Sequence, residues 1–291
     1  MNLLRRMMPV TVALVLVACT TPSKPVAYHH KPKVAIALGG GAAKGFAHIG
    51  VIKVLEANGI VPEIVTGTSA GSVVGSLYAA GYNGMQLQTK AIQLDEANLA
   101  DWTLSSKGFI KGEKLAAFIN GQVGQRPIEK LSKRFGAVAT ELDSGQKVVF
   151  RLGNTGQAVR ASASIPNVFT PVVIGKKRYV DGGLVSPVPV SAAREMGADF
   201  VIAVDITARP KAGAATGFLS MFDQSINIMN VVALRQELQQ ADVVIRPQVQ
   251  SIGTAQFDAR HQAILEGEKA ATQALPQIRR LLQQKTVALN K

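Results

Sequence analysis

The chain has 291 residues, of which 47% are hydrophobic and 18% are charged. This composition supports a buried core in one large domain, or at most two, and it excludes a disordered or fibrous protein. The single cysteine, Cys19, excludes a disulfide framework and a cysteine-based zinc site. The net charge of +13 favours an anionic partner, but aromatic residues are only 5% and the basic residues are scattered, so no nucleic-acid partner is expected.

Residues 1–18 have the pattern of a signal peptide. Arg5 and Arg6 precede an apolar run, residues 9–18, that is too short to span a bilayer as a helix, which takes roughly 20 residues. The run ends in Leu-Val-Ala before Cys19 and resembles a bacterial lipobox, which predicts cleavage and lipidation of Cys19. Thr20, where many inner-membrane lipoproteins carry Asp, favours an outer-membrane lipoprotein facing the periplasm. An ordinary secreted protein with an incidental cysteine, or an uncleaved anchor, is the alternative.

Residues 19–32 are predicted to be the lipidated cysteine and a tether. The segment contains Pro22, Pro25 and Pro32, and proline-rich spacers are extended and semi-rigid. The adjacent His29 and His30 have no third metal ligand near them in the sequence, which favours a solvated linker.

Residues 33–291 alternate short apolar runs with helical patterns. The strands are predicted at residues 33–38, 64–66, 135–140, 147–152, 178–180, 200–204 and 242–245. The helices are predicted at residues 46–58, 70–80, 113–119, 157–164, 218–240 and 260–282. This alternation predicts an α/β fold, a three-layer α/β sandwich around a mostly parallel central sheet. Residues 101–134 give the weakest pattern and are interpreted as a cap or surface insertion.

The pentapeptide Gly67-Thr-Ser69-Ala-Gly71 lies between a predicted strand and a predicted helix. This is the context of a nucleophile elbow, where a strained turn exposes the serine hydroxyl and only small residues fit at Gly67 and Gly71. The turn also places Ser69 at the positive end of the following helix. A plain glycine-rich turn is the alternative interpretation.

A second glycine-rich run, GGGAAKG at residues 39–45, also separates a predicted strand from a helix. Its backbone N–H groups suit an anion, but the run matches neither the Walker pattern nor the dinucleotide pattern G-x-G-x-x-G. The remaining interpretation is an oxyanion hole. In it the N–H groups of Gly40, Gly41 and Ala42 face the developing charge, and Lys44 shapes or polarises the loop.

Two candidates can serve as the base for Ser69. His261 is the only histidine that follows Ser69, but it begins a polar helix and suits a solvated position. The motif Asp181-Gly182-Gly183 follows a predicted strand and either faces a cleft or forms an ordinary β-turn. A Ser–Asp dyad needs no histidine, because a partly desolvated carboxylate takes the serine proton directly.

The order of GGGAAKG, GTSAG and DGG resembles the patatin-like phospholipase family, and the similarity extends to ASASIP and NVFTPV at residues 161–172. It covers residues 33 to about 278 and is greatest to the bacterial branch related to neuropathy target esterase. The resemblance implies Ser69 as nucleophile, Asp181 as base and an oxyanion hole around Gly40 to Ala42. Lys44 stands where the family often has Arg, and it lacks the planar fork of Arg. His48 matches a recurrent helix position and is interpreted as structural.

The resemblance implies hydrolysis of acyl esters in phospholipids or lysophospholipids at an anionic membrane surface, with no metal or cofactor. Apolar residues that could line an acyl channel are Phe109, Ile110, Phe118, Phe169 and Phe222. Two other classes stay open. One is a membrane-tethered binding protein with the same fold, and the other is a general esterase, thioesterase or acyltransferase. A nucleic-acid role is a remote third.

Overall fold

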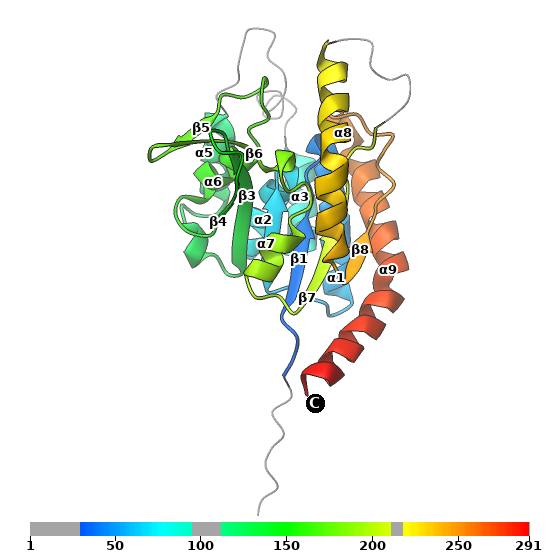
Figure 1. Cartoon of the computed structure of the whole chain (residues 1–291). Coiled ribbons are helices and arrows are strands. Elements are labelled where there is room, and N and C mark those ends of the chain that lie inside the picture. Colours follow the sequence, from blue (N-terminus) through cyan, green and yellow to red (C-terminus); the bar gives the residue numbers. More distant parts are fainter. Residues whose placement is uncertain (1–29, 95–111, 211–217, 291) are drawn as a thin grey trace, which may run out of the picture.

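The computed structural model describes residues 30–94, 112–210 and 218–290 (Figure 1). The predicted signal peptide, Cys19 and nearly all of the predicted tether lie outside the described residues. Within the described ranges, no helix combines the length and the apolarity needed to cross a membrane.

Eight strands within the described ranges form one sheet. The parallel part runs in the order β3-β2-β1-β7-β8, and its members are β3 (Arg134–Glu141), β2 (Ile64–Thr68), β1 (Val34–Leu38), β7 (Phe200–Val204) and β8 (Val243–Ile245). The antiparallel part lies beside β3 and consists of β4 (Lys147–Phe150), β5 (Val172–Ile174) and β6 (Lys177–Asp181). The predicted mostly parallel sheet is confirmed.

Helices cover both faces of the sheet. Alternate side chains of each strand point to opposite faces, and in β1 both sets are apolar and must be covered. Ile36 and Leu38 of β1 pack in one apolar core, whereas Ala35 and Ala37 pack in another. The first core is covered by α1 (Ala47–Ala57), α2 (Ala70–Ala79) and α9 (Arg260–Leu289). The second is covered by α7 (Val190–Glu195) and α8 (Phe218–Gln239), so the fold is the predicted three-layer sandwich (Figure 1).

Among the described residues, α5 (Glu113–Gln122) and α6 (Thr155–Ser162) pack on each other toward the antiparallel side, whereas α3 (Gly84–Gln93) packs mainly on α1. The sequence prediction missed α3, although its capping box of Asn83 and Gln86 is a readable start signal. It also missed α7 and β5, which are too short for a periodic pattern. Helix α9 continues past the predicted end to Leu289 despite Pro276 within it.

Candidate active site

Ser69 occupies the sharp turn between β2 and α2. Its backbone has φ 52° and ψ −122°, and α2 begins at the next residue, Ala70. A positive φ is strained for a residue with a side chain and is held only where the surroundings enforce it. The strand, strained serine and helix thus have the geometry that a nucleophile elbow requires.

The two glycines of the elbow lie where no side chain fits. A Cβ atom on Gly67 would overlap the carbonyl oxygen of Gly71, and one on Gly71 would overlap the carbonyl oxygen of Leu38. Because both neighbours are backbone atoms, neither clash is relieved by a rotamer change. The turn packs directly on the end of β1, which carries the first glycine-rich loop.

A second serine, Ser162, stabilises the elbow through hydrogen bonds, and the sequence alone did not predict this role. The Ser69 N–H donates to Ser162 Oγ at 3.0 Å, and the Ser162 hydroxyl donates to the Val138 carbonyl at 2.6 Å. Ser162 belongs to the ASAS segment at the end of α6. This pair of hydrogen bonds ties the strained turn to β3 and offsets part of its cost.

Strand register brings Asp181 to Ser69. Residues 137–140 of β3 pair with β4 along one edge, while Val138 pairs on its other edge with Thr68 of β2. The next residue, Ala139, pairs there with Asp181 of β6. Strands β2 and β6 therefore meet end to end along one edge of β3. Ser69 directly follows the last residue of β2, Asp181 is the last residue of β6, and both line the same cleft.

The Asp181 carboxyl group is buried, with 6% of the residue exposed. Burial raises its pKa from an ordinary 3.8 to about 6, and this rise is opposed by hydrogen bonds from the Gly183 N–H and the Ser69 side chain. The Gly183 N–H lies 2.7 Å from Asp181 Oδ1. Gly182 allows the chain to turn here, because a Cβ atom would overlap the Val138 carbonyl oxygen. The carboxyl group is thus held as a base of moderate strength beside a hydroxyl group.

The glycine loop passes next to Ser69, but it offers fewer free backbone N–H donors than predicted. The Gly40 N–H donates to the Pro187 carbonyl oxygen at 2.9 Å, so it is already used within the fold. This corrects the expectation that the Gly40 N–H is an oxyanion donor. The role of Gly40 is instead to let the loop backbone lie close to Ser69, since a Cβ atom on Gly40 would lie 3.3 Å from Ser69 Cβ. The N–H groups of Gly41 and Ala42 donate to no acceptor among the described residues. They remain the candidate oxyanion donors.

Lys44 belongs to this loop, and His48 of α1 contacts it. Lys44 is 5% exposed and lines the cleft that contains Ser69 and Asp181. His48 is fully buried in α1, with Nε2 2.8 Å from the Gly39 carbonyl oxygen, and burial lowers its pKa to about 4. A neutral imidazole in that position holds the loop, which agrees with a structural role.

Two cavities meet at Ser69, and they differ in polarity. The apolar cavity holds about 930 Å³ of space including its opening, and its walls include Val74, Leu87, Leu115, Phe118, Phe169 and Phe257. The polar cavity holds about 790 Å³ including its opening, and its walls include Lys44, Asp181, Thr207, Asn227, Asn230 and Thr254. Ala42, Ser69 and Ile165 line both cavities. An ester carbonyl at Ser69 would have an apolar space on one side and a polar space on the other.

Of the predicted acyl-channel residues, Phe118 and Phe169 line the apolar cavity. Phe109 and Ile110 lie outside the described residues, as does the side chain of Phe222. The alternative base, His261, is exposed on α9 and lines neither cavity. The structure therefore brings Ser69 together with Asp181 and not with His261. Among the described residues no cluster of three or more potential metal ligands occurs.

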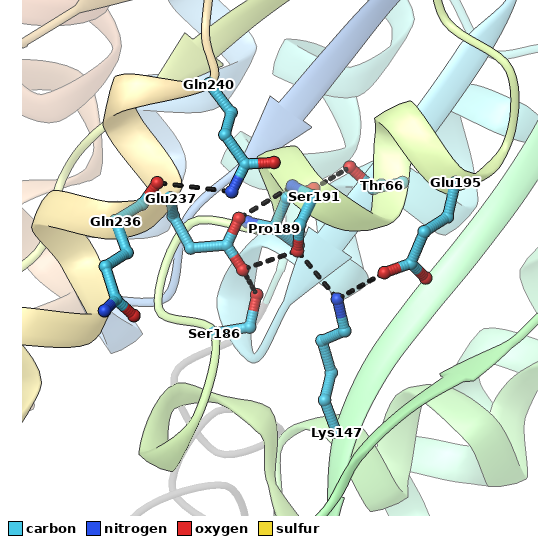
Figure 2. A network of polar contacts seen from close by, with 9 residues as sticks. All are labelled: Thr66, Lys147, Ser186, Pro189, Ser191, Glu195, Gln236, Glu237 and Gln240. Atoms are coloured by element: carbon cyan, nitrogen blue, oxygen red, sulfur yellow. Dashed lines mark hydrogen bonds and ion pairs between the residues drawn. The ribbon is translucent and has the colours of Figure 1, made fainter.

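The buried carboxylate of Glu237 on α8 forms hydrogen bonds with the segment that follows Asp181 (Figure 2). Glu237 accepts hydrogen bonds from Ser186 Oγ at 2.5 Å, from the Ser191 N–H at 2.7 Å and from Ser191 Oγ at 2.8 Å. In the same segment the Ser186 carbonyl oxygen accepts from Thr68 Oγ1 at 2.8 Å. The segment 186–191 thus joins α8, the elbow strand and the glycine loop. No local sequence pattern predicts this junction, because its contacts link residues far apart in the chain.

A model of the patatin-like phospholipase family matches residues 36–194, more than half of the chain. The chain belongs to the patatin-like phospholipase family. The matched region contains all three patatin-like motifs, the glycine loop, the elbow of Ser69 and the Asp181 turn, so the resemblance inferred from the sequence is confirmed at family level.

Relatives of this patatin-like chain include NTE family proteins. One from Mycobacterium tuberculosis is 37% identical over 177 residues, covering 60% of this chain and 49% of the relative. A second from the same organism is 28% identical over 271 residues, covering 82% of this chain and 46% of the relative. Lysophospholipase NTE1 of Debaryomyces hansenii is 30% identical over 179 residues, covering 60% of this chain and 12% of the relative. The chain therefore spans half or less of the length of these relatives.

A solved structure with the same fold is VipD from Legionella pneumophila. The TM-score is 0.59 at 14% sequence identity, and the similarity covers 85% of this chain and 67% of VipD. It supports the patatin-like fold, a mixed, mostly parallel sheet with helices on both sides.

Proposed function

We propose that the chain is a serine acyl-ester hydrolase that acts on lipids, of the phospholipase A or lysophospholipase type. Ser69 is the nucleophile and Asp181 is the base. The observation that carries this proposal is the position of Ser69, which shares a cavity lining with the buried Asp181 carboxyl group at the junction of an apolar and a polar cavity. Support also comes from the family and from the relative named Lysophospholipase NTE1.

In the first step the Ser69 hydroxyl attacks the ester carbonyl carbon and its proton passes to Asp181. The negative charge that forms on the carbonyl oxygen is stabilised by the N–H groups of Gly41 and Ala42, which have no acceptor among the described residues. When the tetrahedral intermediate collapses, Asp181 returns the proton to the departing alcohol. The acyl group remains on Ser69.

In the second step water attacks the acyl-enzyme. Asp181, again deprotonated, accepts a proton from this water and then returns it to Ser69 as the fatty acid leaves. Both steps use one carboxyl group whose pKa, about 6, lies near neutral pH. The acyl chain occupies the apolar cavity, where Phe118 and Phe169 lie, and burial of its methylene groups supplies binding energy.

The test follows fatty-acid release by the full chain from vesicles that contain phospholipid and lysophospholipid. Ser69→Ala and Asp181→Asn are each expected to lower the rate by about 10³-fold or more. Ser76→Ala is the matched control, because Ser76 is a buried serine of α2 that lines neither cavity. Near-normal release by Ser69→Ala would overturn the proposal. Release from wild type only when an acceptor alcohol is added would identify an acyltransferase instead.

We also propose that Cys19 is lipidated after removal of residues 1–18 and that the protein is anchored at the outer membrane, facing the periplasm. Support comes from the lipobox-like sequence before Cys19 and from the net charge of +13, which is still +11 without Arg5 and Arg6, since a lipid chain and basic residues together give a stable anchor on an anionic surface. Metabolic labelling with a palmitate analogue is expected to mark wild type and not Cys19→Ala. Equal labelling of both would contradict this proposal.

A further inference from the structure

The face of helix α8 that packs on the protein carries polar residues in addition to Leu234 and Leu238, which pack in the second core. At 100° per residue, one face contains Asn227, Asn230 and Glu237. The opposite face carries four apolar residues that are each more than half exposed, Met221, Ile228, Met229 and Val232. A surface helix normally turns its polar face to solvent, so the inward direction of these asparagines needs an explanation.

The inward asparagines line the polar cavity beside Ser69. Neither side-chain amide forms a hydrogen bond with any group in the described residues. Such amides, half withdrawn from water, favour a ligand that supplies the missing partners. Because the two residues lie one turn apart, both amides can donate to one group in the cavity.

The remaining walls of this cavity suit an anion. Lys44 contributes a buried basic side chain and Thr254 a hydroxyl group, while the Thr207 hydroxyl proton is already donated to Asp205. Thr207 is held by Asp205, which accepts from its N–H at 3.1 Å and its hydroxyl at 2.6 Å. Asp205 is itself paired with two arginines, Arg209 at 2.6 Å and Arg246 at 3.4 Å, so this corner of the cavity carries net positive charge.

The position of the amides relative to Ser69 is fixed by the contacts of Glu237. Glu237 lies on the same face of α8 as Asn227 and Asn230, and its three hydrogen bonds attach α8 to the segment that follows Asp181 (Figure 2). The face of α8 that carries Asn227 and Asn230 is therefore attached by hydrogen bonds to the segment that follows Asp181.

We propose that the polar cavity binds the phosphate-bearing alcohol portion of a lipid ester, and that Asn227 and Asn230 determine the preference for it. This inference rests on the proposed function, since it assigns the leaving-group side of the same site. The phosphate oxygens accept from the two amides and lie near Lys44, while the acyl chain fills the apolar cavity.

The test compares two substrates with the same acyl chain in the same detergent micelles, palmitoyl-lysophosphatidylglycerol and monopalmitoylglycerol. The full-length wild type is expected to prefer the phosphate-bearing ester in kcat/KM. Asn227→Ala and Asn230→Ala are each expected to lower that preference about tenfold, because each removes a hydrogen bond to an ionised group. Ser225→Ala is the matched control, since Ser225 is exposed on the opposite face of α8.

An equal fall for both substrates in the asparagine variants would overturn the inference, as would a wild type without preference. A second measurement needs no catalysis. Binding of glycerol 3-phosphate to Ser69→Ala, followed by ligand-observed NMR with glycerol as the blank, is expected to weaken in the asparagine variants. Unchanged binding, or none at all, also overturns the inference. If no ester is hydrolysed at all, it is the proposed function that fails, and the binding measurement still decides the phosphate site.

Discussion

At the scale of single residues, Asp181 combines two requirements that oppose each other. A proton acceptor for Ser69 must be ionised, whereas burial favours the neutral form of the carboxyl group and raises its pKa to about 6. Hydrogen bonds from the Gly183 N–H and the Ser69 side chain limit this rise. The balance leaves the carboxylate ionised at neutral pH and a stronger base than an exposed aspartate.

The pH dependence of hydrolysis follows from this pKa. Because Asp181, the proposed base, can accept the serine proton only when it is ionised, kcat/KM is expected to fall about tenfold per pH unit below 6 and to level off above about pH 7. The measurement is the rate of p-nitrophenyl butyrate hydrolysis between pH 4 and 9, with unfolding checked at each pH. A rate that stays constant down to pH 4 would contradict the assignment of Asp181 as base.

The same pKa predicts a cost in stability. Well below pH 3.8 the carboxyl group is protonated in both the folded and the unfolded chain, so it contributes no difference. Between about pH 3.8 and 6 only the unfolded chain ionises, so stability falls as the pH rises, and above pH 6 the loss reaches about 3 kcal/mol at most. Asp181→Asn is therefore expected to be inactive yet more stable than wild type at pH 8, with most of the gain lost at pH 4. Urea unfolding at both pH values measures it, and an equal difference at the two would argue against this account.

At the scale of elements, α8 is positioned by one carboxylate. Glu237 lies on α8 and is buried, and all three of its hydrogen bonds go to Ser186 and Ser191 in the segment after the Asp181 turn. Removal of Glu237 leaves one buried and two partly buried donors without this acceptor, which costs about 1–3 kcal/mol for each group that stays unpaired.

Glu237→Ala is expected to lower the free energy of unfolding by about 2 kcal/mol and to lower kcat, because the chain between Asp181 and α8 loses its attachment. The matched control is Gln236→Ala, whose exposed side chain points away from this network (Figure 2). Its effect on unfolding is expected to stay within about 0.5 kcal/mol. The two variants are compared by urea unfolding and steady-state kinetics, and equal losses in both would count against the role of Glu237.

At the scale of the whole molecule, α9 closes the fold by packing on α1 over one face of the sheet. The two helices approach so closely that a Cβ atom on Gly267 of α9 would overlap the carbonyl oxygen of Ala47. Gly50 of α1 makes a similar close approach to the Ile264 carbonyl oxygen. The C-terminal helix is thus fitted to the helix that follows the glycine loop.

Gly267→Ala is expected to destabilise the protein by about 2 kcal/mol or more, because the backbone of α1 must move to admit the methyl group. Gly121→Ala is the matched control, since Gly121 also lies in a helix, α5, and a Cβ atom there has open space. That variant is expected to gain about 0.5–1 kcal/mol from helix propensity. Thermal unfolding measures both, and a neutral Gly267→Ala would refute the close packing of α1 and α9.

The sequence by itself determined the features that depend on neighbouring residues. The strand, Gly-x-Ser-x-Gly and helix order predicts the elbow, because a turn in which backbone atoms nearly touch admits only glycine at residues 67 and 71. The alternation of apolar runs and helical patterns likewise predicts the layered α/β fold. The missed helix α3 had a local signal too, in its capping box.

Only the tertiary structure decided what depends on contacts between distant segments. Val138 of β3 pairs with Thr68, and the next residue, Ala139, pairs with Asp181. These two pairings place the Asp181 carboxyl group beside Ser69, which follows Thr68. The hydrogen bond from Gly40 to Pro187 removes one predicted oxyanion donor, and the contacts of Glu237 bring α8 into the wall of the cleft. Strand register and long-range hydrogen bonds carry no local periodicity, because their energy arises only once the segments have come together.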